Sequence, residues 1–161
     1  MIKKNGFTLV ELLVVLAILS LLATVGFGQY RTSQKKARDA QRKADLDNIG
    51  RALEMYYNDN GTYPLGDDGL VSIDGAQIDW GEQLIKEYAD ESVIYMKSLS
   101  VDPADNQHYC YESTTGGYYR IFTILENDND SDISGSYGCT YQGDVESYNY
   151  GVASFNVGLT D

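Results

Sequence analysis

Hydrophobic and polar residues follow two different patterns in the first third of the chain. From Leu12 to Gly28 the sequence is apolar apart from Ser20 and Thr24. Counted from Phe7, this stretch is long enough to cross a bilayer as a helix, which rises about 1.5 Å per residue. We therefore expect a transmembrane helix here.

The helical pattern continues beyond residue 30 but becomes one-sided. Apolar residues recur at intervals of three and four, which places them on one face of a helix: Leu46, Ile49, Leu53 and Tyr56. Asn60-Gly61 marks the stop, because glycine commonly follows the last helical turn. The sequence predicts one unbroken helix from about Phe7 to Tyr57.

The remaining residues predict a short helix and several strands. Asp79, with Glu82 three residues later, has the spacing of a capping box, so we expect a helix at about 80–89. Runs of β-branched and aromatic residues predict strands at His108–Glu112, Tyr118–Leu125, Tyr137–Gln142 and Ser147–Val157. A small antiparallel sheet packed on the long helix would bury Ile49, Leu53, Ile121 and Leu125.

The predicted fold class is therefore α+β. A long N-terminal helical spine is apolar and membrane-spanning in residues 7–30 and amphipathic in residues 31–58. Residues 59–161 form a globular head built on a small C-terminal antiparallel β-sheet.

Charge is distributed unevenly along this architecture. From residue 52 onward 3 basic residues stand against 20 acidic ones. Such an acidic body argues against nucleic-acid binding, which needs a basic surface. Six basic residues gather at the start of the amphipathic half, where they would contact anionic lipid or the acidic heads of neighbouring molecules, or simply form a solvated helix face. They are Arg31, Lys35, Lys36, Arg38, Arg42 and Lys43.

Cys110 and Cys139 are the only cysteines of the chain. Their spacing does not suit a zinc site. If the head lies outside the cytoplasm, a disulfide between them is expected, with about 3–4 kcal/mol of stabilisation from the closed loop. Two reduced, buried thiols are the alternative.

The N-terminal sequence KKNGFTLVELLVVLAIL resembles the leader of type IV pilins and type II secretion pseudopilins, the class III signal peptide. The resemblance implies that a prepilin peptidase removes residues 1–6 by cutting after Gly6, and then methylates the new amine of Phe7. Two alternatives stay open. An ordinary secretory signal would need a small-residue cleavage site after the apolar stretch, and a plain membrane anchor would leave Glu11 unexplained.

The resemblance also gives Glu11 a role in assembly. An unpaired carboxylate in hydrocarbon costs several kcal/mol, roughly, and pairing it with the Phe7 ammonium of a neighbouring subunit offsets this cost. Glu11 lying at the membrane interface is the alternative. The chain departs from the family pattern in having Gly26 and Gly28 where many members carry a proline, so we expect a point there that can unwind.

An acidic stretch in the head, ENDNDSD, is the candidate metal site. Its four carboxylates are those of Glu126, Asp128, Asp130 and Asp132, and carboxylate oxygens are the ligands that Ca²⁺ prefers. The stretch does not match an EF-hand. Some pseudopilins that the chain resembles bind calcium in a comparable loop, whereas a merely solvated acidic loop is the alternative.

No enzyme motif is present, and His108 is the sole histidine. The resemblance implies a structural subunit. Its partners would be other pilin subunits, a prepilin peptidase and an inner-membrane assembly machinery. The fibre would start in the cytoplasmic membrane, reach the cell surface, and serve adhesion, motility, DNA uptake or protein secretion as a pilus or pseudopilus. The alternative is a single-pass, membrane-anchored extracellular binding protein that does not polymerise.

Overall fold

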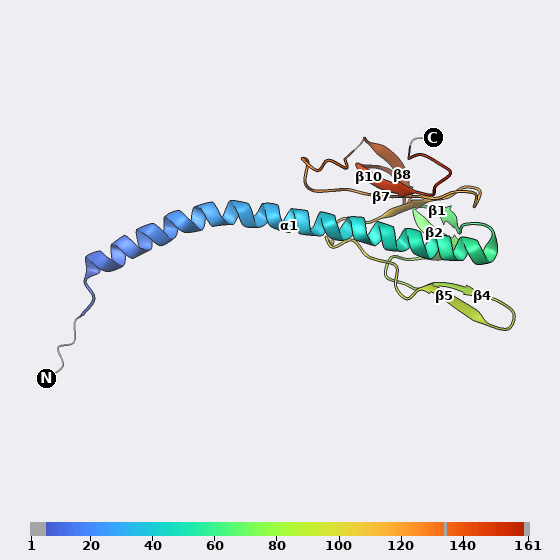
Figure 1. Cartoon of the computed structure of the whole chain (residues 1–161), viewed down its shortest axis with the longest axis horizontal. Helices are drawn as coiled ribbons and strands as arrows, with labels where there is room; N and C mark the ends of the chain where they lie inside the picture. Colours follow the sequence, from blue (N-terminus) through green and yellow to red (C-terminus); the bar gives the residue numbers. More distant parts are fainter. Residues whose placement is uncertain (1–5, 134, 160–161) are drawn as a thin grey trace. The chain divides into compact units, whose positions relative to one another are not determined.

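The computed structural model describes residues 6–133 and 135–159, with the side chains of residues 25–27 left aside. It contains one long helix, α1 (Leu9–Asn60), followed by ten short strands. The chain divides into two compact units, Met1–Ala37 and Arg38–Asp161. The division falls inside α1, so the second half of the helix belongs to the same unit as the strands (Figure 1).

The strands form four antiparallel groups. A three-stranded sheet contains β1, β2 and β3, and a second one has the order β10-β7-β6, while β4 with β5 and β8 with β9 form hairpins. Their bounds are β1 Leu65–Asp67, β2 Leu70–Ile73, β3 Ala76–Ile78, β4 Leu84–Glu87, β5 Ser92–Met96, β6 Cys110–Glu112, β7 Arg120–Thr123, β8 Tyr137–Tyr141, β9 Asp144–Tyr148 and β10 Tyr150–Ala153. The predicted α+β class, a long helix followed by small antiparallel sheets, is confirmed.

In the first unit no other element packs against the described part of α1. The large apolar side chains from Phe7 to Leu22 are 44–75% exposed. The hydroxyls of this stretch are satisfied by the helix itself, since Ser20 donates to the carbonyl of Leu16 and Thr24 to those of Ser20 and Leu21. Hydroxyl groups that are bonded to the backbone in this way can enter an apolar surrounding.

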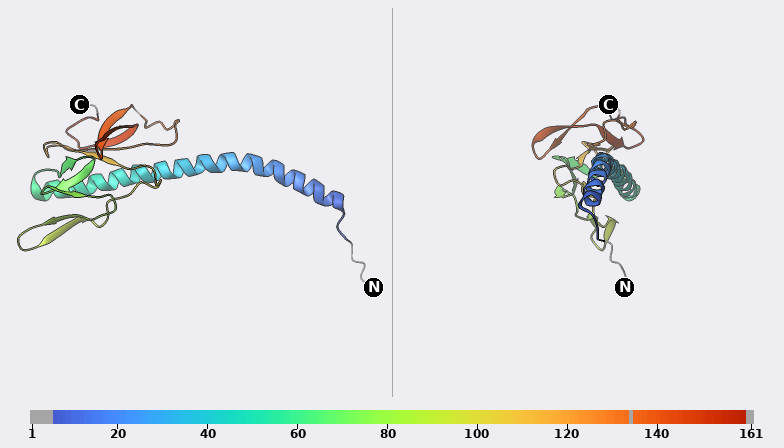
Figure 2. Two further views of the ribbon diagram at one scale, coloured as in Figure 1. Left: turned by 180° about the vertical axis from the view of Figure 1, so that it is seen from behind. Right: turned by 90° about the vertical axis from the view of Figure 1, so that its left-hand side faces the viewer.

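In the second unit the amphipathic face of α1 forms one side of the core. Leu46, Ile49 and Leu53 are fully buried in a cluster that includes Tyr109, directly before β6, and Ile121 on β7. The sheet β10-β7-β6 and the hairpin β8–β9 lie on one side of the helix, and the hairpin β4–β5 lies on the other (Figures 1 and 2). The predicted burial of Ile49, Leu53, Ile121 and Leu125 is confirmed.

The helix ends as its sequence predicts. Gly61 has φ of +72° and donates its backbone N–H to the carbonyl of Tyr57, so it closes the last turn in the left-handed conformation that favours glycine. The helix continues through Gly26 and Gly28. Unwinding of that segment in a fibre stays a prediction.

The helix predicted at 80–89 is wrong. The Glu82 carboxylate does accept a hydrogen bond from the backbone N–H of Asp79, but the pattern closes a turn. Gly81, between them, has φ of +100° and donates to the carbonyl of Leu99, whose own N–H donates to the carbonyl of Glu82. Because these bonds tie the turn to a neighbouring loop, the chain continues as strand β4 in place of a helix.

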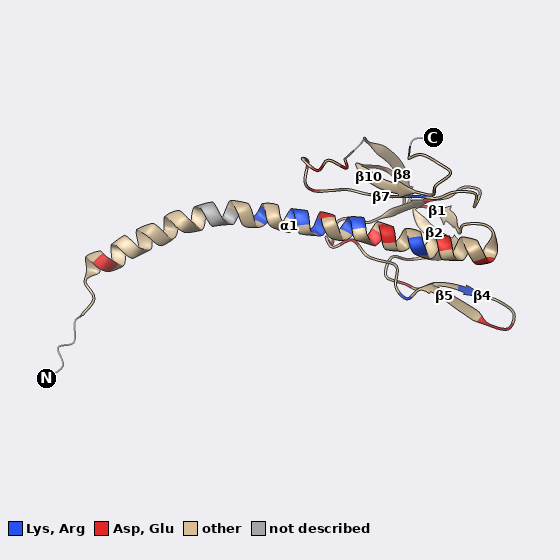
Figure 3. Cartoon of the chain, in the orientation of Figure 1, with Lys and Arg blue, Asp and Glu red and all other residues tan. Residues whose placement is uncertain are grey.

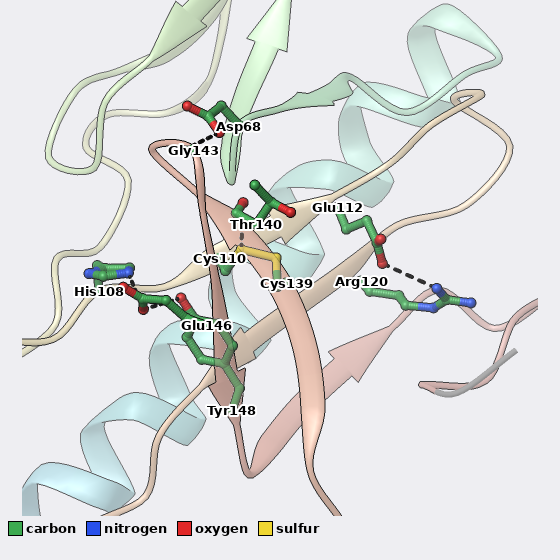
Figure 4. Close-up of a disulfide and its surroundings, with 10 residues drawn as sticks. All are labelled: Asp68, His108, Cys110, Glu112, Arg120, Cys139, Thr140, Gly143, Glu146 and Tyr148. Atoms are coloured by element: carbon green, nitrogen blue, oxygen red, sulfur yellow. Dashed lines mark hydrogen bonds and ion pairs between the residues drawn. A yellow bond between two sulfur atoms is a disulfide. The ribbon is translucent and has the colours of Figure 1, made fainter.

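The strand predicted at Ser147–Val157 is two strands in different sheets. The break is Asn149, whose Oδ1 accepts from the N–H of Leu125 at 2.7 Å and whose Nδ2 donates to the carbonyl of Leu125 at 3.0 Å. This side chain substitutes for strand pairing where the chain passes from β9 to β10. A disulfide between Cys110 on β6 and Cys139 on β8 links the sheet β10-β7-β6 to the hairpin β8–β9 (Figure 4).

Candidate functional site

The proposed processing site lies directly before the helix. Residues 6–8 are neither helix nor strand, and Phe7 is 75% exposed. A side chain placed at Gly6 would meet no other atom within 4 Å. The peptide bond between Gly6 and Phe7 is thus free of secondary structure in the described part of the chain. The rest of the predicted leader, residues 1–5, falls outside the described residues.

Glu11 and Thr8 close a reciprocal cap on the start of α1. The Glu11 Oε2 atom accepts from the backbone N–H of Thr8 at 2.9 Å and from the Thr8 hydroxyl at 2.7 Å. The Thr8 Oγ1 atom accepts from the N–H of Glu11 at 3.2 Å. This is a capping box, which satisfies N–H groups that have no partner inside the helix. This cap was not predicted, although Thr-x-x-Glu before an apolar run is its sequence signal.

The cap leaves part of the Glu11 carboxylate open. Both hydrogen bonds to this carboxylate end on Oε2, so among the described residues Oε1 accepts none. An anionic oxygen at the N-terminal end of a helix is stabilised by the helix dipole. The same oxygen is available to an ammonium group from another molecule.

The second unit holds a buried ion cluster centred on Arg42. The guanidinium donates two bonds of 2.8 Å to the carboxylate of Asp102, one of 2.8 Å to Asp39 and one of 2.9 Å to Glu126. The side chain of Arg42 is 0% exposed. Asp102 lies in the loop after β5 and Glu126 in the loop after β7. A single side chain of the helix thereby fixes two distant loops.

The loop after β7 is further held by backbone and cationic contacts. The carboxylate of Asp39 accepts from the N–H groups of Glu126 and Asn127 at 2.9 Å each. Arg38 binds both oxygens of Glu126, at 2.7 and 2.5 Å. Lys43 donates to Asp130 and Asp132 at 2.6 Å each. These contacts, within the second unit, attach the loop to α1.

The predicted basic segment thus splits into two groups. Arg38, Arg42 and Lys43 pair with carboxylates of the same head. Arg31, Lys35 and Lys36 are exposed, and no ion pair of theirs occurs among the described residues. Figure 3 shows these basic residues following one another along α1. Contact with lipid or with neighbouring heads stays a prediction for the exposed group.

The residues predicted to bind calcium do not converge in this arrangement. Within the described ranges no group of three or more acidic, histidine or cysteine side chains is placed to share a metal ion. The carboxylate of Glu126 faces Arg38 and Arg42, whereas those of Asp130 and Asp132 face Lys43. The donor set as placed does not fit Ca²⁺, and calcium binding here stays a prediction.

His108 contacts one acidic and one aromatic side chain of the hairpin β8–β9. Its Nε2 atom lies 2.8 Å from Glu146 (Figure 4), and its ring stacks on Tyr141 with 3.6 Å between the centroids. These contacts fasten the segment before β6 to the hairpin β8–β9. The arrangement is one of structural packing.

Three features together are typical of pilin-like subunits: an exposed apolar helix, a glutamate in its first turn, and a small domain of antiparallel strands after it. Residues 1–27 match the prokaryotic N-terminal methylation motif, and residues 29–137 match the type II secretion system protein G family. The chain belongs to this family, whose members are structural subunits. It is a pilin-like subunit that assembles with other pilin subunits in a fibre.

Individual relatives agree with this assignment. The chain is 31% identical to the type II secretion system core protein G of Pseudomonas aeruginosa, over 81% of this chain and 94% of the relative. It is 30% identical to the Vibrio cholerae protein of the same name, over 76% and 80%. The type IV wide pilus major component PilA4 of Thermus thermophilus is 37% identical over 44% of this chain and 54% of its own. No solved structure matches the chain.

Replacing Arg42 by methionine should destabilise the head by about 3–5 kcal/mol, because it leaves buried carboxylates without their cation. Urea unfolding of the full chain in detergent measures the difference. Arg51→Met is the matched control, since Arg51 is an exposed arginine on the same helix. Equal stability of the two variants would contradict a central role for Arg42.

The lowered pKa of Glu126 predicts that the stability of the head depends on pH. The hydrogen bond from Arg38 holds the pKa of this carboxyl at about 2, against an ordinary value of 4.5. Because the pKa is lowered by folding, the stabilisation is complete above about pH 4.5 and is lost as the pH falls toward 2.

Glu126→Gln should therefore cost on the order of 2–3 kcal/mol at pH 7 and almost nothing near pH 2. Urea unfolding at a series of pH values measures the gap between the two proteins. Glu87→Gln, at an exposed position on β4, is the control. A gap that stays constant with pH would show that Glu126 acts through packing instead.

Proposed function

We propose that a prepilin peptidase cleaves this chain after Gly6 and methylates the amine of Phe7. The mature subunit is then held in the cytoplasmic membrane by α1 and polymerises through the apolar half of that helix into a fibre outside this membrane. The observation that carries the proposal is the exposed apolar surface from Phe7 to Leu22, which nothing in its own unit covers. By length and composition, α1 is the one described helix suited to crossing a membrane.

Exposed apolar area of this kind needs lipid or other copies of the same helix around it, because water is an unfavourable surrounding. The capped Glu11 adds a specific requirement to this general one. Its open oxygen in an apolar surrounding calls for a cation, and cleavage after Gly6 creates one at Phe7. Processing and assembly are therefore chemically linked in this proposal.

We favour a fibre of the type II secretion kind, serving protein secretion. The match to the protein G family extends through residues 29–137 and thus includes most of the head. A type IV pilus, serving adhesion, motility or DNA uptake, is the second candidate, supported by the match to the Thermus pilus component over 71 residues. Fibres sheared from the cell surface and consisting mainly of this chain would favour the pilus.

The mass of the protein isolated from its native membrane tests processing directly. The expected N-terminus is a methylated Phe7, because the peptide bond after Gly6 is accessible and glycine has no side chain to obstruct a protease. Intact-mass spectrometry gives the answer. A chain still starting at Met1 in cells that contain the peptidase would leave a membrane-anchored binding protein as the better explanation.

Glu11→Ala should abolish fibres, because the variant cannot pair with the Phe7 ammonium of a neighbour. Electron microscopy of sheared fibres and cross-linking of subunits in the membrane provide the readout. An anchored protein that never polymerises would be indifferent to this change.

Glu11→Gln separates assembly from helix capping. Glutamine also serves at this position of a capping box, so the helix start is kept while the charge is lost. We expect the glutamine variant to fail in assembly as the alanine variant does. Normal fibres from the glutamine variant would show that Glu11 matters only for the cap.

A further inference from the structure

Lys43 binds two carboxylates of the acidic loop. Its ammonium nitrogen lies 2.6 Å from Asp130 Oδ1 and 2.6 Å from Asp132 Oδ2, and 5.5 Å from the ring centre of Tyr150. The Lys43 side chain is only 25% exposed. Burial works against its charge, but the hydrogen bonds to the two aspartates raise the pKa of Lys43 overall. The group is a fixed, charged ammonium.

The position of this ammonium resembles that of a bound calcium ion. Calcium lies about 2.3–2.6 Å from its carboxylate oxygens, and the Lys43 nitrogen has nearly the same separation from two such oxygens. A cation bridging Asp130 and Asp132 would therefore have to take the place of the ammonium. Glu126 adds no third ligand, since Arg38 and Arg42 hold its carboxylate.

We infer that Lys43 is a tethered counter-ion, which pairs with Asp130 and Asp132 in the position that a divalent cation would take. The loop closes on α1 through three cations of the helix itself, Arg38, Arg42 and Lys43. The head of this subunit is then folded and stable without calcium. This inference concerns the head alone and holds whether or not the proposed fibre forms.

A tethered cation differs from a free ion in its dependence on the surroundings. A bound ion stabilises a protein according to its free concentration, so removal of the ion weakens the fold. An ammonium attached to α1 is always present, and its effect does not change with the calcium level. The predicted consequence is a head that unfolds at the same temperature with and without calcium.

Thermal unfolding of the full chain in detergent, followed by near-UV circular dichroism, tests this directly. The two conditions are a chelator and about 1 mM Ca²⁺, a concentration at which extracellular calcium modules bind. The midpoints of the wild-type protein should agree to within about 1 °C. A rise of several degrees on adding calcium would overturn the inference.

Lys43→Met removes the charge and keeps the length of the side chain. Its midpoint in chelator should fall by about 3–8 °C, and calcium should restore at least half of the loss, because the ion would replace the lost cation beside Asp130 and Asp132. No fall, or a fall that calcium leaves unchanged, would contradict the inference.

Two further variants complete the test. Lys43→Arg keeps a cation in the loop and should respond to calcium as little as the wild type does. Lys86→Met removes a lysine that is paired with Asp74 outside the loop. Calcium should not restore any stability lost in this control, and recovery there would show that the ion acts unspecifically.

Discussion

The head depends on one buried guanidinium. Arg42 binds carboxylates from three parts of the chain, its own helix and the loops after β5 and β7, and it has no contact with water. A charge in such a place is tolerated only when it is fully paired, since removing it from water costs several kcal/mol, roughly. The three carboxylates have the same need. Helix and loops are therefore bound to one arrangement, because any other one would leave a charge buried alone.

The contacts around this cluster extend the same constraint. Asp39 receives N–H groups of the loop after β7, and Arg38 shares Glu126 with Arg42. Apolar packing of Leu46, Ile49 and Leu53 supplies the bulk of the buried surface. Such packing is tolerant of small shifts, whereas hydrogen bonds of 2.5–2.9 Å are not. The ions thus set the register in which the apolar face of α1 meets the strands.

The sequence was informative where a pattern is repeated over many residues. The helix, its apolar and amphipathic halves and its end at Gly61 follow from periodicity and from one glycine. Local signals were less reliable. The capping-box spacing is present at both Thr8 and Asp79, yet only the first begins a helix. At the second, Gly81 and the backbone hydrogen bonds to Leu99 hold the chain in a turn. The difference lies in tertiary hydrogen bonds, which a short stretch of sequence does not reveal.

Other misses had a usable signal. The sheet of β1, β2 and β3 was not predicted, although Asp68-Gly69 and Asp74-Gly75 are the dipeptides that two-residue hairpins favour, and both have positive φ at each position. The ion cluster had no such signal. Asp39, Asp102 and Glu126 are far apart in the sequence, and only the fold brings them to Arg42. The acidic loop was predicted as a calcium site, which stays a prediction, and its pairing with Lys43 had no local signal because the lysine lies in α1.

The boundary between the two units has a consequence for how this helix can vary. From Leu12 to Leu22 any apolar residue of suitable size serves the same purpose, since the large side chains there are exposed and pack against no other element of that unit. From Arg38 onward each residue on the buried face has a particular partner. One continuous helix therefore carries a stretch that tolerates exchange between related subunits and a stretch that does not. Chimeric subunits joined before Arg38 keep the head intact, and those joined within 38–56 mix incompatible partners.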